Sequence, residues 1–297
     1  MKRWLVLLLG LLPVACSSQL QAPHPHYALG KPYRADGVWH YPRQQLSAVE
    51  TGLAAVIPSG HPPLTANGEA FDQDALAAAS PTLQLPAIAR LTNLATGRQV
   101  VVRINDRGPA DPGRLVAVTR RVADLLGFPA SGVAPVRLHV LAGPSQTAEA
   151  AVPGTPRLAM AAAPVGAVVA APLGPPGRAP DAPAQIALAT VAPAPAVAAQ
   201  PAQARIVPAL SGRVQQVAPE HTMLWVRLAG FGEYQYAAVL AARLSGLHPQ
   251  IAREMTDGAE HFTVRIGPFA QPVAADSMLR RAIAAGVGDA RIVVRQE

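Results

Sequence analysis

Two carboxylates lie in turn-like stretches of the sequence, 37 residues apart. Glu69 belongs to TANGEAFD (65–72) and Asp106 to VVVRINDRGP (100–109). Cleavage of a glycosidic bond needs a positioned carboxyl group that protonates the leaving oxygen, often with a second acid nearby. The pair therefore predicts chemistry on a glycosidic bond if the fold brings both acids into one groove. The alternative is a turn in which Asp106 bonds the backbone or pairs with Arg107.

Residues 27–142 must supply the framework for these turns. Short apolar runs at 87–91, 99–104 and 136–141 are separated by Gly, Asn and Pro, which predicts a β-rich domain. One stretch differs, because 119–127 has helical spacing with Thr119 as a cap and Gly127 as its end. Asp106 follows an apolar run, which offers a desolvated position that favours a protonated acid.

The bulk composition restricts the class of protein. The chain has 297 residues, a formal net charge of +7 and 31 prolines, with 50% hydrophobic but only 4% aromatic residues. A basic balance fits nucleic acid, anionic lipid or an acidic polymer, and it also fits an arginine-biased composition with a solvated face. The sequence contains no metal cluster, phosphate loop or cofactor fingerprint, so no cofactor is expected.

Residues 1–16 are typical of a bacterial lipoprotein signal peptide. Lys2 and Arg3 precede an apolar run at 4–15 that is too short to span a bilayer and ends at Cys16. Cys16 is the only cysteine of the sequence, so no internal disulfide is expected. It is the predicted lipidation site, although Pro13 stands where leucine is usual. The expected location is the periplasm, anchored to the outer membrane, which removes nucleic acid as a partner.

Composition divides the remaining chain into four segments. A short tether at 17–26 leads into the β-rich domain at 27–142. Alanine and proline dominate 143–218, where dense proline prevents regular structure and alanine buries little area, so a disordered linker is predicted. Globular patterning returns in a C-terminal domain at 219–297.

The C-terminal domain is predicted to be a small α+β fold. Apolar residues alternate in strands at 224–228, 262–266 and 290–294, and helical spacing covers 236–244 and 273–285. The strand, turn and helix order occurs twice. This internal repeat predicts a ferredoxin-like arrangement with two helices on one antiparallel sheet.

Several spaced motifs between residues 30 and 141 resemble the rare lipoprotein A family. They are GKPYRADGVWHYP (30–42), TANGEAFD, TLQLP (82–86), ARLTNLATGRQVVVRINDRGP (89–109) and PGR (112–114). The resemblance implies a double-psi β-barrel and lytic transglycosylase activity on peptidoglycan glycan strands. It also implies that Asp106 acts as acid and base with Glu69 assisting.

The sequence departs from the family pattern at three places. The usual Trp-Tyr-Gly is replaced by Val56, Ile57 and Pro58, and the usual Ile-Asp-Leu-Ser by residues 116–119. Ser80 stands where the family has a histidine, and a hydroxyl cannot shuttle protons near neutral pH as an imidazole can. His61 and His40 are candidate substitutes, but nothing in the sequence places either of them beside Asp106.

The C-terminal segment is similar to the SPOR module through WVRLAGF (225–231) and HFTVRIGPF (261–269). That resemblance implies binding to glycan strands that lack stem peptides. Strand alternation places four side chains on the sheet face opposite the helices, where they could stack on sugar rings or bond hydroxyls: Trp225, Arg227, Thr263 and Arg265. An ordinary polar sheet face is the alternative.

The sequence thus supports a lipid-anchored lytic transglycosylase acting on denuded glycan strands. Expected partners are those strands, the membrane through the lipid anchor, and division-site proteins. A septal peptidoglycan-binding scaffold with impaired catalysis is the second hypothesis, favoured by Ser80. Two purely structural spacer domains are the third.

Overall fold

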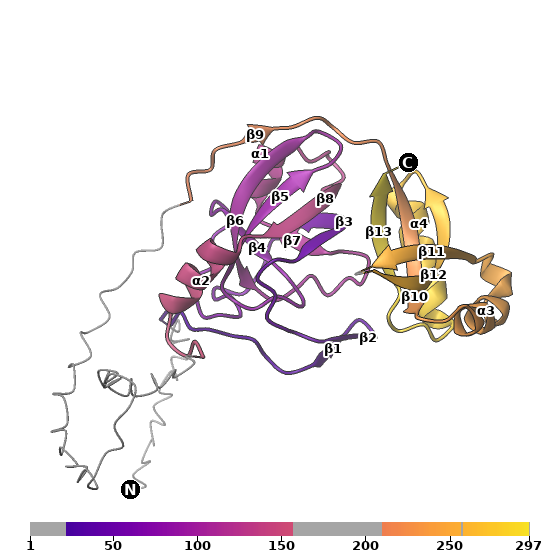
Figure 1. Ribbon diagram of the computed structural model, residues 1–297. Helices are drawn as coiled ribbons and strands as arrows, with labels where there is room; N and C mark the ends of the chain where they lie inside the picture. Colours follow the sequence, from indigo (N-terminus) through magenta and orange to yellow (C-terminus); the bar gives the residue numbers. More distant parts are fainter. Residues whose placement is uncertain (1–21, 157–209, 257, 297) are drawn as a thin grey trace, which may run out of the picture.

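A computed structural model describes residues 22–156, 210–256 and 258–296. Two domains lie side by side within these residues, a β-barrel and a smaller α+β domain (Figure 1). The predicted signal peptide, Cys16 and most of the predicted linker lie outside the described residues. In the part that is described, no helix combines the length and apolar character needed to cross a bilayer.

The N-terminal domain is a closed six-stranded barrel of the double-psi type, as predicted. Its strands follow the order β4-β7-β3-β8-β5-β6, and β6 pairs with β4 to close the barrel. The β3–β7 and β4–β6 pairs are parallel and the others antiparallel. The strands are β3 (Val49–Val56), β4 (Ala77–Ala79), β5 (Ala87–Asn93), β6 (Arg98–Asp106), β7 (Val116–Val118) and β8 (Val133–Val140).

Alternating apolar residues fill the barrel core. Every second residue of β8 is buried, and the predicted apolar runs correspond to β5, β6 and β8. Helix α1 (Arg120–Leu126) also forms as predicted and ends at Gly127, which adopts a left-handed conformation with φ 68°. Thr119 lies at the N-cap position but its side chain makes no capping hydrogen bond, and its hydroxyl donates to the carbonyl of Ala75 over 2.7 Å.

The ordered structure extends into residues that composition predicted to be disordered linker. Helix α2 (Ala142–Ala150) packs on β5, where the Ser145 hydroxyl donates to the Ile88 carbonyl and accepts from the Ile88 amide. Before the second domain, β9 (Gln215–Gln216) pairs with the start of β6. Alanine buries little area alone, but here a neighbouring sheet supplies a packing surface and buried hydrogen bonds. Residues 157–209 lie outside the described part.

A small hairpin precedes the barrel. Its strands β1 (Tyr33–Ala35) and β2 (Val38–His40) pair with each other. The phenolic hydroxyl of Tyr33 donates to the Pro81 carbonyl over 3.1 Å, and the amide of Arg43, just beyond β2, donates to the Thr82 carbonyl over 2.9 Å. These bonds fasten the hairpin to the segment that follows β4.

The C-terminal domain is a small α+β fold, as predicted, and its element order is βαββαβ, which is ferredoxin-like. Its antiparallel sheet runs β11-β12-β10-β13 and carries both helices on one face. The sequence patterns indicated each element except β11 and a short 3-10 turn, η1 (Ser245–Leu247). The others are β10 (Thr222–Phe231), α3 (Tyr234–Arg243), β11 (Gln250–Thr256), β12 (Ala259–Phe269), α4 (Pro272–Ala284) and β13 (Arg291–Gln296).

The two domains are joined through β3 and β13. The Thr51 hydroxyl donates to the Val294 carbonyl over 2.7 Å, and Leu53 is fully buried in the same apolar cluster as the C-terminal core. Arg114 of the barrel forms two hydrogen bonds, of 2.6 and 2.8 Å, with the carboxylate of Asp276 on α4. The contact therefore combines apolar packing with a partly buried ion pair.

Candidate active site

The two predicted turns meet at one end of the barrel. In the turn at residues 65–69, the Gly68 amide donates to the Thr65 carbonyl and the Thr65 amide to the Glu69 carbonyl, each over 2.9 Å. Gly68 has a φ of 79°, and a Cβ there would collide with the backbone carbonyl of His24, so glycine is required. The Ala66 amide in this turn donates to Asp106 Oδ1 over 2.7 Å, which joins the turn to the end of β6.

Asp106 is held by three groups and is only 5% exposed. Its Oδ1 accepts from the amides of Ala66 and Arg107 over 2.7 and 2.8 Å. Its Oδ2 lies 2.6 Å from Nε2 of His61. The Arg107 guanidinium points elsewhere, to the carbonyls of Ala28, Leu29, Ser80 and Leu83. The alternative interpretation of the sequence made Asp106 a turn residue that bonds the backbone or pairs with Arg107. The backbone bonds are present, but the ion pair with Arg107 is not.

His61 is the residue whose position the sequence did not reveal. Its ring stacks on Phe71 with centroids 4.0 Å apart, and its Nδ1 lies 2.8 Å from the Pro62 carbonyl. The Nε2–Oδ2 distance is short, but Oδ2 makes no hydrogen bond of good geometry within the described residues. Asp106 and His61 therefore lie close enough to exchange a proton.

Glu69 lies in the same site, but it is tied into an ion pair. Its carboxylate accepts from the Arg103 guanidinium over 2.6 to 3.1 Å, from Asn105 over 2.9 Å and from Asn67 over 2.7 Å. Burial acts to raise the pKa of Glu69, but the Arg103, Asn105 and Asn67 bonds outweigh it and the net pKa is lowered. Glu69 is therefore an anion neutralised by Arg103, so it contributes little like-charge repulsion at Asp106.

Ser80 contacts Asp106 only through the backbone. Its amide donates to the Asp106 carbonyl over 3.0 Å, while its buried hydroxyl oxygen accepts from the amides of Thr82 and Leu83. His40 stacks instead on Tyr33 in the hairpin, with centroids 5.0 Å apart. Of the two histidines considered as substitutes, only His61 contacts Asp106. In the described residues, no group of three or more His, Cys, Asp or Glu could hold a metal ion.

The predicted sugar-binding side chains of the C-terminal sheet are not brought to Asp106. The Arg265 guanidinium carbon lies 4.1 Å from the centroid of the Trp225 ring, so the cation covers a ring face that was expected to meet sugar. Arg227 lies on the same strand as Trp225 and faces the barrel domain across a hollow. Thr263 is buried and its hydroxyl has no hydrogen-bond partner within the described structure.

Comparison with known proteins gives the class of this barrel. Residues 49–138 match the family model described as lytic transglycolase. Endolytic peptidoglycan transglycosylase RlpA from Rickettsia bellii is 35% identical over 120 residues, which cover 39% of this chain and 53% of the relative. RlpA from Campylobacter jejuni is 41% identical over 113 residues, which cover 37% of this chain and 41% of the relative. RlpA from Escherichia coli K12 is 52% identical over 80 residues, which cover 26% of this chain and 22% of the relative.

The barrel is therefore an RlpA-like double-psi β-barrel of the lytic transglycosylase type. The matched part of the chain spans about half or less of the length of these curated relatives. One solved structure, the peptidoglycan-binding domain of the Bacillus subtilis cell wall lytic enzyme CwlC, aligns over 28% of this chain and 100% of its own. The identity there is 23% and the TM-score 0.23.

Proposed function

We propose that this protein is a peptidoglycan lytic transglycosylase that acts on glycan strands lacking stem peptides. The single observation that carries the proposal is the pairing of Asp106 with His61 in a barrel of the lytic transglycosylase type. A reaction of this class uses one group twice, first as acid and then as base. We infer that the pair shares one proton, which would meet that requirement.

The first step transfers this proton to the glycosidic oxygen, while the bond from that oxygen to the muramyl C1 breaks. The 6-hydroxyl of the same muramyl residue then forms a bond to C1 and gives its proton to the Asp106–His61 pair. The result is a 1,6-anhydromuramyl end, a free hydroxyl on the leaving sugar and a pair restored to its starting state. Two backbone amides on Asp106 Oδ1 keep Oδ2 directed toward His61 throughout.

Glu69 assists by positioning rather than by proton transfer in this proposal. Its bonds to Arg103 and Asn105 anchor the 65–69 turn to β6, and that turn supplies the Ala66 amide to Asp106. His61 supplies the imidazole that resemblance to the family led us to expect at position 80. A Ser80→His substitution is therefore expected to give no gain in turnover, and a clear gain would contradict the assignment of His61.

We further propose that Cys16 carries a lipid and holds the protein on the periplasmic face of the outer membrane. The C-terminal domain would bind denuded glycan as a SPOR-like module through Trp225, Arg227 and Arg265. Of these, the Trp225–Arg265 pair offers a cationic surface rather than a bare aromatic ring. Division-site proteins are the expected protein partners.

The test is to incubate the purified chain with denuded glycan strands and to detect 1,6-anhydromuramyl products by mass spectrometry. Asp106→Asn keeps the size of the side chain and an acceptor for the two amides, and it should abolish the products. Asp124→Asn, at an exposed position of α1, is the matched control and should cleave like the wild type.

The second candidate function is a catalytically impaired glycan-binding scaffold. It is favoured by the burial of Asp106, whose three partners leave little of its carboxyl group open to a sugar. Binding of the wild type to amidase-treated sacculi with no anhydro product would support the scaffold and overturn the enzyme. Failure of both binding and cleavage would overturn both.

A further inference from the structure

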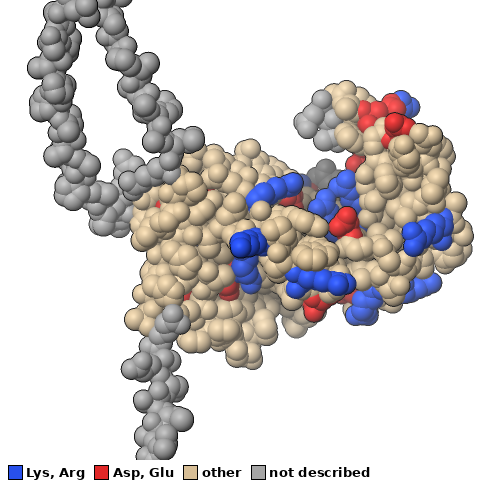
Figure 2. All heavy atoms as spheres, turned by 90° about the horizontal axis from the view of Figure 1, so that it is seen from below, with Lys and Arg blue, Asp and Glu red and all other residues tan. Residues whose placement is uncertain are grey.

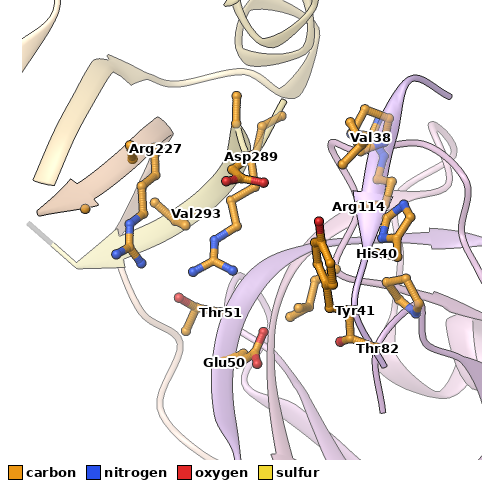
Figure 3. Close-up of a pocket in the computed structure, with 18 of the residues that line it drawn as sticks. Val38, His40, Tyr41, Glu50, Thr51, Thr82, Arg114, Arg227, Asp289 and Val293 are labelled. Carbon is orange, nitrogen blue, oxygen red and sulfur yellow. The ribbon is translucent and has the colours of Figure 1, made fainter. Parts of the chain in front are cut away.

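A hollow of about 880 Å³ lies between the barrel domain and the C-terminal domain. One wall is the β1–β2 hairpin and β3, and the other is formed by β10 and β13. The face in Figure 2 shows Lys and Arg side chains on both sides of the junction between the domains. In Figure 3, Tyr41 and Arg227 face the hollow from opposite walls, with Glu50 and Thr51 between them on β3.

An exposed aromatic pair stands on the barrel side of this hollow. Trp39 and Tyr41 are 51% and 58% exposed, and their rings lie 6.4 Å apart at 29°. Nearly parallel exposed rings are suited to stacking on the apolar faces of sugars. The hairpin that carries them is fastened by Tyr33 and Arg43 to residues 81 and 82, so the platform is held in place.

His40 adds a polar group that lacks a partner. It lines the hollow, is 8% exposed, and its Nε2 makes no hydrogen bond within the described structure. Burial lowers the pKa of His40 and nearby Asp36 only partly opposes this, so the ring is neutral at pH 7. An unpaired buried nitrogen is unfavourable, but this atom has almost no accessible surface, so a ligand hydroxyl would reach it only after a local shift of the hairpin.

The charge on the walls is predominantly positive. Among the described residues that line the hollow, five are arginines and two are acids: Arg43, Arg114, Arg227, Arg291 and Arg295, with Glu50 and Asp289. Two of the arginines are paired with acids outside the hollow, Arg114 with Asp276 and Arg295 with Glu254. Burial, and then the neighbouring charge of Arg291, lowers the pKa of Arg227. An anionic ligand would relieve this repulsion.

We propose that this hollow is a glycan-binding site shared by the two domains, in which Trp39 and Tyr41 stack on sugar rings and Arg227 and Arg291 bind muramyl carboxylates. The inference rests on the proposed function, since it assigns the path of the same substrate. A muramyl residue without its stem peptide carries a free carboxylate, whereas a peptide-bearing residue has an amide at that position. The arginines therefore favour denuded strands.

The lining of the hollow includes a segment next to the candidate active site. Pro81 and Thr82 directly follow Ser80, whose amide donates to the Asp106 carbonyl. Asp106, Glu69 and His61 themselves do not line the hollow. The C-terminal domain acts in this arrangement as one wall of the substrate path as well as a separate binding module.

The test compares two matched substitutions in the full chain. Tyr41→Ala removes a ring from the hollow, whereas Tyr236→Ala removes a ring of similar exposure, 56%, from α3 outside it. Dissociation constants for purified denuded glycan strands are measured for both variants, for Trp39→Ala and for the wild type. Aromatic anchors commonly contribute at least 1.4 kcal/mol, so we expect Tyr41→Ala and Trp39→Ala to weaken binding about tenfold or more. Tyr236→Ala should bind like the wild type.

Further measurements distinguish this inference from the proposed function. Peptide-bearing strands should bind more weakly than denuded strands to the wild type. If the wild type cleaves glycan, Tyr41→Ala should raise KM with kcat nearly unchanged. Wild-type affinity for denuded strands in both hairpin variants would overturn the shared site, even if the enzyme is active. Absence of cleavage by the wild type would overturn the proposed activity alone, because the binding comparison still decides the site.

Discussion

Nε2 of His61 lies 2.6 Å from Oδ2 of Asp106, although the two residues are 45 positions apart in the sequence. The other ring nitrogen lies 2.8 Å from the Pro62 carbonyl, and two backbone amides donate to the other carboxylate oxygen. These four contacts hold the two side chains in place. The chemistry we propose depends on a proton shared between them.

Replacing His61 should affect catalysis more than stability. His61→Ala removes the partner that shares the proton, and loss of such acid–base help lowers rates by about two to four orders of magnitude. We expect a fall of about a hundredfold or more in kcat for anhydromuramyl product formation. His221→Ala, at an exposed position in the segment before β10, is the control. Wild-type kcat in His61→Ala would exclude the imidazole from the reaction.

The ion pair between Glu69 and Arg103 should determine part of the acid stability of the barrel. The folded-state pKa of Glu69 is lowered from the ordinary value of 4.5, so its ionised form stabilises the fold above that pH. This contribution is lost as the pH falls below about 4.5 toward the lowered value. Urea unfolding of Glu69→Gln between pH 3 and 7, in roughly half-unit steps, should show a flatter dependence than the wild type. Equal slopes for both proteins would refute this role.

Removing the cation of that pair should destabilise the barrel strongly. Arg103→Met leaves Glu69 partly buried without its main partner, and breaking such a pair costs up to about 3 to 5 kcal/mol. Because this pair is partly exposed, we expect a loss of about 2 kcal/mol. Adding Glu69→Gln to Arg103→Met should recover much of the lost free energy of unfolding. No recovery in the double variant would show that Arg103 acts through packing instead.

Removing the charge of Glu149 should stabilise the folded protein. Burial raises its pKa, and bonds from Gln84 and Gln44 only partly oppose this. A raised pKa gives the fold extra stability at acidic pH, which is lost as the pH rises through the folded value. Glu149→Gln stays neutral, so at pH 7 it should be more stable by about 1 kcal/mol, or about 2 to 4 °C in Tm. A lower Tm for Glu149→Gln would contradict the prediction.

The contact between the domains should respond to the Arg114–Asp276 ion pair. The Arg114 side chain is 9% exposed and that of Asp276 20%, so solvent screens the pair only in part. A double-mutant cycle with Arg114→Ala and Asp276→Ala should give a coupling energy of about 1 to 2 kcal/mol in unfolding of the C-terminal domain. Arg280→Ala, exposed on the same helix, should show no coupling to Arg114→Ala. A coupling near zero would mean that the Arg114–Asp276 pair does not help to hold the domains together.

Much of the architecture could be predicted from the sequence, because the signals are local. The alternation in β8, the helix that ends at Gly127 and the glycine turn at residues 65–69 each depend on neighbours a few positions away. The meeting of the two turns also follows from the motifs that resemble the family. Helix α2 was missed because its alanines become useful only when β5 lies beside them, with Ser145 bonded to Ile88.

The chemical state of the site was decided by tertiary structure alone. Barrel closure brings His61 to Asp106, gives Glu69 an arginine partner and turns the Arg107 guanidinium toward backbone carbonyls. In the other domain it is packing that lays Arg265 over Trp225. Residue types and spacing in the sequence indicate which groups can ionise or stack. Which partner each group takes depends on distances across the fold, and a hydrogen bond or ion pair forms only over a few ångströms.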